Sequence, residues 1–245
     1  MVARLGEFPF SLALNPEERT LLDGYAEWAP VYDGPNPLIE AEEPLVRPLL
    51  AEHAGPGVRA LDAPCGTGRH NAFLAGLGCN TVGVHQSAEM LAIARPKVPS
   101  ARFEQAGLDG LPFGDASFDL AVCSLAMCHL ADPTVAIVEL GRVLRVGAVL
   151  VISDPHPLMA MSGGQAFYGG IEPGRPMTWV RNHSHRASTW LRAFRAADFV
   201  VVDCFEPVVT EAQIRAHPAV VFYPEAARGA VEDLPAMWVW SLAKA

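Results

Sequence analysis

The sequence has little charge and no cluster of basic residues. Only 18% of its 245 residues are Asp, Glu, Lys or Arg, against about a quarter in typical soluble proteins. The 27 acidic and 18 basic residues give a formal net charge of −9. Affinity for nucleic acids comes largely from basic contacts to phosphates, so we expect no nucleic-acid partner.

Long apolar runs and paired cysteine motifs are also missing. The longest apolar stretches, such as residues 148–152, are far shorter than the ~20 residues of a membrane-spanning helix. The first residues, MVARLGEFP, have an acid and a proline where a signal peptide needs an apolar run. The five cysteines are an odd number without a CxxC pair, which argues against disulfides and zinc knuckles. We expect a cytoplasmic protein with no membrane association and no metal.

The sequence does contain a regular alternation of short apolar runs and amphipathic stretches. It predicts one α/β domain over residues 1–245, a Rossmann-like seven-stranded, mostly parallel sheet with helices on both faces. The expected strands are 58–61, 81–84, 101–104, 118–124, 148–153, 199–205 and 238–242. The expected helices are 68–77, 87–94 ended by Pro96, 133–144 and 184–197. Residues 207–235 give no clear pattern.

Nine of the residues from 155 to 176 are Gly or Pro, too many for a helix interior. We therefore expect a long excursion at the carboxyl end of the fifth strand, the edge that faces ligands in open α/β sheets. Residues 155–183 and 1–35 are the two candidate lid segments. Their aromatic residues could form an apolar lid over a small molecule, or simply pack as surface loops: Phe8, Phe10, Phe167, Tyr168 and Trp179.

Residues 60–70, ALDAPCGTGRH, combine a strand end, an acid, a glycine turn and a helix start. Gly66 and Gly68 let the backbone approach a ligand closely, and the N–H groups at the helix start favour a carboxylate or phosphate. An NAD-binding fingerprint needs a third glycine where Asn71 stands and an acid where His85 stands, so this class fits poorly.

The segment closely resembles motif I (LDxGCGTG) of the class I S-adenosylmethionine-dependent methyltransferases, and specifically the type 11-like group. The similarity continues through TVGVHQSAEML (81–91), GLPFGDASFDL (110–120) and ELGRVLR (139–145), and covers roughly residues 20–155. It implies S-adenosylmethionine as the cofactor. By position it implies these cofactor contacts: Tyr32, Asp62, Ala63, Cys65, Gly66, Gly68, His85, Gln86, Met90, Gly107, Leu108 and Ser124.

The sequence departs from this family at both carboxylates that hold the nucleoside. His85 stands at the position of the acid that binds the ribose hydroxyls, and Gly107 at that of the acid that binds the adenine amino group. A neutral imidazole accepts one hydrogen bond where a carboxylate accepts two, and glycine offers no side chain. Gln86 or Asp109 could compensate. Pro64 also replaces the first motif glycine.

Two histidines are candidate bases for removing a proton from a methyl acceptor. His129 follows the fourth strand and His156 follows the fifth, both at the ligand edge, although a structural role is a sufficient alternative for each. His183 and His185 lie two residues apart, but no third metal ligand of suitable type is evident nearby. Tyr25, Trp28 and Tyr32 are spaced either as a segment covering the cofactor or as a core-facing helix stripe.

These features predict methyl transfer from S-adenosylmethionine to oxygen or nitrogen of a small organic metabolite of secondary metabolism. The Asp/Asn-Pro-Pro-aromatic motif of many base and amide N-methyltransferases is absent after the fourth strand, where Ser124-Leu-Ala-Met stands. Two alternatives remain open: an enzyme of this fold that has lost methyl transfer and catalyses cyclisation or isomerisation in an apolar cavity, and a non-catalytic small-molecule binding protein.

Overall fold

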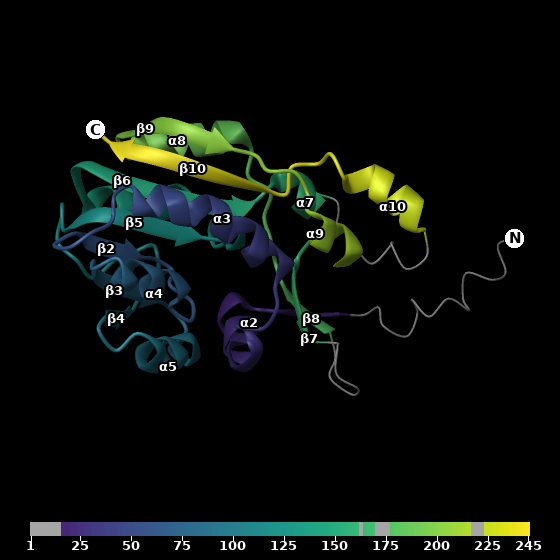
Figure 1. Ribbon diagram of the computed structural model, residues 1–245, viewed down its shortest axis with the longest axis horizontal. Coiled ribbons are helices and arrows are strands. Elements are labelled where there is room, and N and C mark those ends of the chain that lie inside the picture. The colour runs from purple at the N-terminus through teal and green to yellow at the C-terminus, as the bar shows by residue number, and fades with distance from the viewer. Residues whose placement is uncertain (1–15, 162–163, 170–176, 217–222) are drawn as a thin grey trace, which may run out of the picture.

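A seven-stranded sheet forms the centre of the computed structural model, which describes residues 16–161, 164–169, 177–216 and 223–245 (Figure 1). The strand order is β4-β3-β2-β5-β6-β10-β9; β4 to β6 run parallel, and β10 pairs antiparallel with β6 and β9. The strands are β2 (Arg59–Asp62), β3 (Asn80–His85), β4 (Arg102–Gln105), β5 (Phe118–Ser124), β6 (Leu144–Pro155), β9 (Phe199–Phe205) and β10 (Met237–Lys244). The predicted fold is thus confirmed.

Helices cover both faces of the sheet, as predicted. On one face α3 (Pro37–Ala51) and α4 (Arg69–Gly76) pack on the central strands, in front of the sheet in Figure 1, and α5 (Ala88–Lys97) packs on β3 and β4. On the other face lie α6 (Thr134–Val143) and α8 (Ala187–Ala196). Alternate residues of β5 enter the two cores, which explains why its sequence is apolar almost throughout.

The chain order along the sheet reverses between β2 and β5. The connections from β2 lead outward to β3 and β4, whereas the chain leads from β5 to β6 in the other direction. The loops after β2 and β5 therefore leave the sheet on opposite sides and open a crevice at its carboxyl edge. Ligands of open α/β sheets bind at this point.

Several predicted boundaries differ from the structure by one to four residues, as at α8, which begins at Ala187 rather than at 184, and two of these differences have a clear physical cause. Helix α5 passes Pro96 and ends at Lys97, because a proline in the last turn removes one N–H while the N–H of Val98 still donates to the carbonyl of Ala94 at 3.0 Å. Strand β6 begins at Leu144 rather than at 148. It passes through Gly147 at φ +79°, where the register with β5 shifts as in a bulge.

Helix α3 has no signal in the sequence analysis because Pro44 and Pro48 lie inside it. The Asn36 side chain caps its start, and Pro37 stands at the first helical position, where a missing N–H costs little. Val46 and Leu50 are fully buried against the sheet. Packing therefore outweighs the two lost hydrogen bonds, and it fixes the position of Glu42 over the carboxyl edge.

A second, three-stranded sheet joins segments distant in sequence. Strand β8 (Met177–Val180) pairs parallel with β1 (Glu17–Arg19) and antiparallel with β7 (Ala166–Gly169). Together with α2 (Leu21–Trp28) and η2 (Ala29–Val31) it forms what we call the cap. The excursion also holds the short helix α7 (Pro157–Met161), although its Gly and Pro content predicts none. A lid role for the cap remains a prediction, and Phe8 and Phe10 lie outside the described residues.

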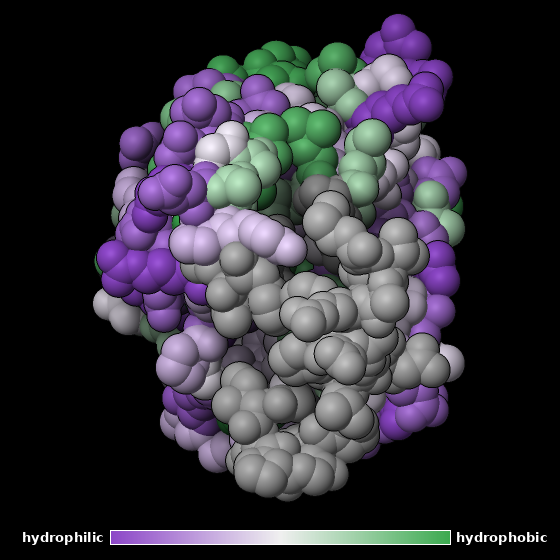
Figure 2. All heavy atoms as spheres, turned by 90° about the vertical axis from the view of Figure 1, so that its right-hand side faces the viewer, coloured by the Kyte–Doolittle hydropathy of each residue, from purple (hydrophilic) through white to green (hydrophobic). Residues whose placement is uncertain are grey.

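The region without a clear pattern in the sequence holds α9 (Glu211–Ala216) and α10 (Pro224–Val231). The end of the molecule with these helices faces the viewer in Figure 2, where hydrophilic residues lie along the left and right edges of the view. No helix in the part of the chain that the structure describes is long and apolar enough to cross a membrane.

Close packing of α2 on β8 makes a first prediction. A Cβ atom at Gly24 would stand 2.3 Å from Cγ2 of Val180, so Gly24→Ala is expected to lower the free energy of unfolding by about 1–3 kcal/mol. Gly229 in α10 has open space around it, and Gly229→Ala is expected to raise stability by up to ~1 kcal/mol. Urea denaturation measures both. Equal effects of the two substitutions would contradict tight α2–β8 packing.

Candidate active site

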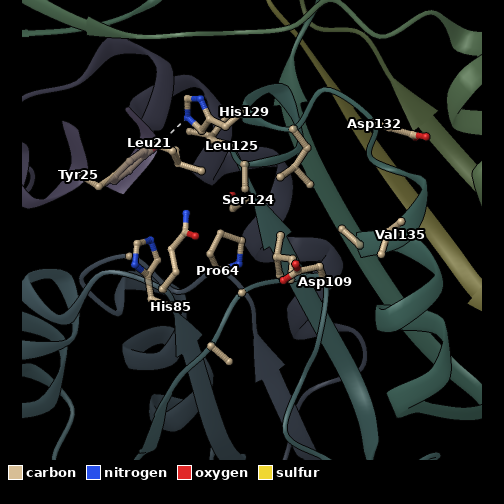
Figure 3. Close-up of a pocket in the computed structure, with 18 of the residues that line it drawn as sticks. Leu21, Tyr25, Pro64, His85, Asp109, Ser124, Leu125, His129, Asp132 and Val135 are labelled. Carbon is tan, nitrogen blue, oxygen red and sulfur yellow. Dashed lines mark hydrogen bonds between the residues drawn. The ribbon is translucent and has the colours of Figure 1, made fainter. Parts of the chain in front are cut away.

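A cavity of about 220 Å³ lies at the carboxyl edge of the sheet, beside the point where the strand order reverses (Figure 3). Side chains from the cap, the glycine turn and the loops after β3, β4 and β5 meet there. The lining residues are Leu21, Tyr25, Tyr32, Pro64, Gly66, His85, Gln86, Ala106, Gly107, Leu108, Asp109, Ser124, Leu125, Ala126, His129, Leu130, Asp132, Val135 and Ala136. We call it the edge cavity.

Eight of the predicted site residues line the edge cavity, and six lie elsewhere. Those that line it are Tyr32, Gly66, His85, Gln86, Gly107, Leu108, Ser124 and His129. Of the other six, Asp62, Ala63, Cys65 and Gly68 are buried in and behind the turn, Met90 of α5 is buried against Tyr25 and Tyr168 of the cap, and His156 is part of a separate cluster. Sequence position therefore selects residues of the turn but does not separate those that line the cavity from those that support the turn.

The glycine turn adopts a backbone shape that other residues take only with strain. Gly66 has φ +53° and Gly68 has φ +83°, both in the left-handed region. A Cβ atom at Gly68 would also stand 3.3 Å from the Cβ atom of Ala94 on α5. The Thr67 hydroxyl donates to Asp33 at 2.6 Å and so links the turn to the chain after η2. These contacts hold the turn rigidly beside the cavity.

Asp62 supports the turn from behind. Its Oδ2 accepts from the backbone N–H of Asn71 at 3.1 Å, and its Oδ1 is buried without a partner among the described residues. Complete burial raises the pKa of this carboxyl to about 6. Asp62 therefore ties the end of β2 to the start of α4 rather than facing the edge cavity.

At the position where the family carries a ribose-binding acid, His85 is a neutral hydrogen-bond donor. Its Nδ1 accepts from the backbone N–H of Ser87 at 3.0 Å, which assigns the ring hydrogen to Nε2. Burial lowers the pKa of His85 to about 4, so the ring stays uncharged near neutral pH. It packs against the Tyr25 ring, with centroids 5.8 Å apart. An Nε2–H donor can bind one oxygen of a diol.

A carboxylate does stand beside Gly107, although the residue itself has none. A Cβ atom at Gly107 would lie 2.5 Å from Oδ1 of Asp109, and both residues line the edge cavity. The Asp109 carboxylate thus occupies the space that a side chain at 107 would fill (Figure 3). Of the two candidates for compensation, Asp109 supplies an acid, and Gln86, which follows His85 in the sequence, also lines the edge cavity.

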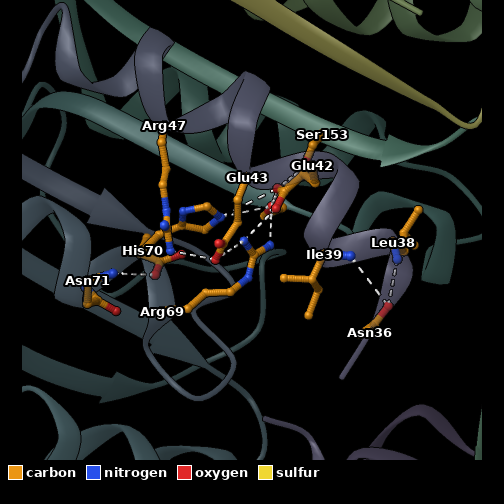
Figure 4. Close-up of polar contacts among 12 residues, drawn as sticks. Asn36, Leu38, Ile39, Glu42, Glu43, Arg47, Arg69, His70, Asn71 and Ser153 are labelled. Atoms are coloured by element: carbon orange, nitrogen blue, oxygen red, sulfur yellow. Dashed lines mark hydrogen bonds and ion pairs between the residues drawn. The ribbon is translucent and has the colours of Figure 1, made fainter. Parts of the chain in front are cut away.

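A buried polar cluster beneath Ser124 has no counterpart in the sequence predictions (Figure 4). Glu42 of α3, fully buried, forms an ion pair of 2.5 Å with Arg69 and accepts from Ser124 and, at 2.5 Å, from Ser153. Arg69 donates to Ser124 at 2.9 Å, and Nε2 of His70 lies 3.2 Å from the same oxygen. The cluster joins α3, α4, β5 and β6. The signal in the sequence that could have pointed to this cluster is the pair Arg69-His70 directly after the glycine turn.

His129 is positioned as a neutral base with a defined tautomer. Its Nδ1 donates to the carbonyl of Arg181 at 2.9 Å, because a carbonyl can only accept. Its Nε2 therefore carries a lone pair and accepts from the Tyr25 hydroxyl at 2.7 Å. Burial lowers the pKa of His129 and raises that of Tyr25 well above 10. Near neutral pH, His129 can take a proton and Tyr25 cannot.

His156 lies outside the edge cavity with both ring nitrogens engaged. Its Nε2 lies 3.1 Å from Oε1 of Glu206, its Nδ1 accepts from the N–H of Leu158 at 3.3 Å, and its ring packs edge-on against Trp238. These contacts fix the start of the excursion.

His183 and His185 form no metal site with other described residues. Their ring centroids are 6.4 Å apart, and His185 Nε2 bonds to the carbonyl of Met127 at 3.0 Å. Within the described ranges, no group of three or more His, Cys, Asp or Glu side chains is arranged to hold a metal.

Comparisons with known proteins agree with this geometry. A family model described as "Methyltransferase domain" matches residues 61–152. The O-methyltransferase cnsE of Penicillium expansum is 38% identical over 111 residues, which are 41% of this chain and 40% of the relative. The demethylmenaquinone methyltransferase of Renibacterium salmoninarum is 30% identical over 151 residues, 60% of this chain and 63% of the relative. The chain spans about half the length of the curated relatives it matches.

Among solved structures, an S-adenosylmethionine-dependent methyltransferase from Mesorhizobium loti is similar over most of the molecule. The match covers 91% of this chain and 100% of that one, with 28% identity and a TM-score of 0.61. The similarity therefore extends beyond the matched domain into the segments that form the cap and the last strands.

Proposed function

Because the chain belongs to the class I S-adenosylmethionine-dependent methyltransferase family, we propose that it transfers a methyl group from S-adenosylmethionine to a small organic metabolite. The observation that carries this proposal is the edge cavity. It brings the glycine turn, a donor at His85, a carboxylate at Asp109 and a neutral base at His129 to one place. We place the activity in the cytoplasm, where the five free cysteines would stay reduced.

The residues present fit the cofactor despite the two lost carboxylates. In this proposal the turn at Gly66 receives the methionine part, with Ser124 beside it. His85 Nε2–H binds one ribose hydroxyl, and Asp109 takes the adenine amino group in place of a side chain at 107. A carboxylate that accepts from an amino group is the stronger of these contacts, since hydrogen bonds to charged groups contribute roughly twice as much as neutral ones.

The bound cofactor supplies a methyl group on a cationic sulfur, and its transfer to an acceptor hydroxyl releases one proton. Nε2 of His129 takes that proton. Its lone pair already faces the cavity side occupied by the Tyr25 hydroxyl, while Nδ1–H is held by the Arg181 carbonyl. Arg181 thus keeps the ring in the tautomer that a base requires.

The acceptor in this proposal is small and is not a polyanion. The net charge of −9 and the acidic lining residues Asp109 and Asp132 disfavour nucleic acids. The relative cnsE is named an O-methyltransferase, which favours oxygen as the methylated atom, and we place the acceptor in secondary metabolism.

Calorimetric titration with S-adenosylmethionine and S-adenosylhomocysteine, followed by transfer of a labelled methyl group to a metabolite panel, tests the proposal. We expect micromolar binding of both and labelled product. Absence of binding would favour the alternative of a non-methylating enzyme, which the changes at His85 and Gly107 suggested. Tight metabolite binding without turnover would favour a binding protein.

The role of Asp109 makes a second prediction. Asp109→Asn is expected to weaken binding of S-adenosylhomocysteine about 10–100-fold, the loss of one charge-assisted hydrogen bond. The control Asp132→Asn removes a charge from the same cavity and should change the dissociation constant little. The double variant Asp109→Ala/Gly107→Asp should recover affinity, because the substitution at 109 clears the space for the new side chain. Equal losses in the two Asn variants would instead indicate a general charge effect.

A further inference from the structure

A second cavity of about 190 Å³ lies directly beside the edge cavity and shares part of its wall. Tyr25, Tyr32, Leu125 and His129 line both. We call the second one the cap cavity, because the cap covers it. Its remaining lining residues are Trp28, Asn36, Leu38, Cys128, Pro155, Gln165, Ala166, Phe167 and Asn182.

The shared wall is built around the candidate base. The Tyr25 hydroxyl donates to Nε2 of His129 at 2.7 Å, and the two rings meet edge-on with centroids 5.4 Å apart. Leu125 has φ +51°, a strained conformation for a bulky residue, and its N–H donates to the carbonyl of Ser153 at 2.8 Å. The hydrogen-bonded pair of Tyr25 and His129 thus stands between the two cavities, and both residues line each of them.

The cap cavity has a different chemistry from the edge cavity. None of the described residues that line it is an acid, a lysine or an arginine, and burial lowers the pKa of His129, so this ring is neutral near neutral pH. Aromatic rings of Tyr25, Trp28, Tyr32 and Phe167 supply flat apolar surfaces.

The described residues offer polar contact through neutral groups, chiefly the side-chain amides of Asn36, Gln165 and Asn182. The side-chain Oδ1 of Asn182 is buried without a partner among the described residues. The backbone N–H of Asn182 donates to Oε1 of Gln165 at 2.6 Å. An unpaired buried acceptor costs stability unless a ligand hydroxyl or N–H group satisfies it.

We propose that the cap cavity binds the methyl acceptor, and that this acceptor is an uncharged, hydroxylated aromatic compound about one substituted ring in size. A cavity of ~150 Å³ accommodates benzene, so 190 Å³ suits a substituted ring. The acceptor hydroxyl replaces the Tyr25 hydroxyl at Nε2 of His129. The acceptor oxygen then bonds to the methyl carbon, the carbon–sulfur bond breaks with its electron pair on sulfur, and the hydroxyl proton passes to Nε2. This inference rests on the proposed function.

Three rings that differ in charge test the inference: 4-methylcatechol, 3,4-dihydroxybenzoate and dopamine, each with labelled S-adenosylmethionine. We expect methylation of the uncharged ring and at least ~10-fold lower kcat/KM for the charged ones, the cost of a charge desolvated without a partner. Titration with S-adenosylhomocysteine is run beside it. A protein that does not bind S-adenosylhomocysteine fails the proposed function, whereas one that binds it but methylates only a charged ring, or none of the three, overturns the cap-cavity inference.

Two variants locate the acceptor. Gln165→Glu keeps the side-chain shape and the oxygen that accepts the hydrogen bond from the Asn182 N–H, but it adds a negative charge, and it should raise KM for 4-methylcatechol at least ~10-fold. Ala166→Leu fills part of the cap cavity and should raise KM by a similar factor. Both should leave S-adenosylhomocysteine affinity unchanged, which also shows that they fold. The control Gln213→Glu, on α9, should change neither. An unchanged KM in both cavity variants would overturn the inference.

Discussion

Replacing His129 with glutamine is expected to lower kcat for methyl transfer by about 10²–10⁴-fold while the affinity for S-adenosylhomocysteine stays nearly constant. The reason is that His129 lines both cavities and its Nε2 carries a lone pair, whereas glutamine has no group that accepts a proton near neutral pH. Steady-state kinetics with the best acceptor from the panel, and calorimetry for the cofactor product, separate the two effects.

The matched control is His156→Gln, which removes an imidazole that lies outside the edge cavity, hydrogen-bonded to Glu206. His156→Gln should lower the free energy of unfolding but change kcat little.

Activity in the parent protein should fall as the pH drops below 6.5. Burial lowers the pKa of His129, so this ring gains a proton and ceases to be a base only at a pH below its usual value. If His156→Gln costs more kcat than His129→Gln, the base is assigned to the wrong histidine.

Replacing Glu42 with glutamine is expected to lower the free energy of unfolding by about 3–5 kcal/mol, which corresponds to a fall in Tm of about 10 °C for a domain of this size. Glu42 is fully buried, and its loss leaves the Arg69 guanidinium without its nearest counter-charge beneath Ser124. Removing one member of a buried pair is costly because the remaining charge has lost its solvent and its partner.

Glu43→Gln is the matched control, since it changes the same residue type one position later on α3. The Glu43 side chain is 25% exposed and lies 3.7 Å from Arg69, so the expected loss is below ~1 kcal/mol. Thermal and urea denaturation of both variants give the comparison. Similar losses would mean that the cluster contributes little beyond surface charge.

The stabilising effect of Glu42 should depend on pH. Burial alone would raise the pKa of its carboxyl, but hydrogen bonds and charge interactions with His70 and Arg69 outweigh burial and hold the pKa far below 4.5. A lowered folded-state pKa gives stability that is complete above the unfolded value and is lost as the pH falls below it. The stability gap between the parent and Glu42→Gln should therefore shrink below pH 4.5.

Measuring that gap, rather than the stability of the parent alone, isolates Glu42. Burial raises the pKa of Asp62 to about 6 and that of Asp154 to about 7, which acts in the opposite direction. Both carboxyls are present in the parent and the variant, so the effect of burial on their pKa values cancels. The interaction of Asp62 with Glu42 does not cancel, but Glu42 comes last among the causes that shift the pKa of Asp62. A gap that widens below pH 4.5 would contradict the ion-pair interpretation.

The sequence alone determined the sheet, the glycine turn and the family, because these depend on local patterns. Strand periodicity, the N-cap residue Ser87 of helix α5 and the spacing of Gly66 and Gly68 are properties of neighbouring residues. The same local reasoning placed His129 at the ligand edge, since the end of a parallel strand has a fixed place in such a sheet. It failed at α3, where packing of Val46 and Leu50 outweighs two prolines.

Only the tertiary structure decided which residues share a site. Glu42 and Ser153 are hydrogen-bonded although 111 positions separate them in the sequence, and Tyr25 and His129 are hydrogen-bonded across 104 positions. No local sequence pattern carries information over such separations. The Asp109 carboxylate fills the space beside Gly107 because the loop after β4 turns it there, and His156 leaves the edge cavity because Glu206 and Trp238 hold it. The sequence thus determined which edge of the sheet carries the glycine turn, and long-range packing decided which side chains line the edge cavity.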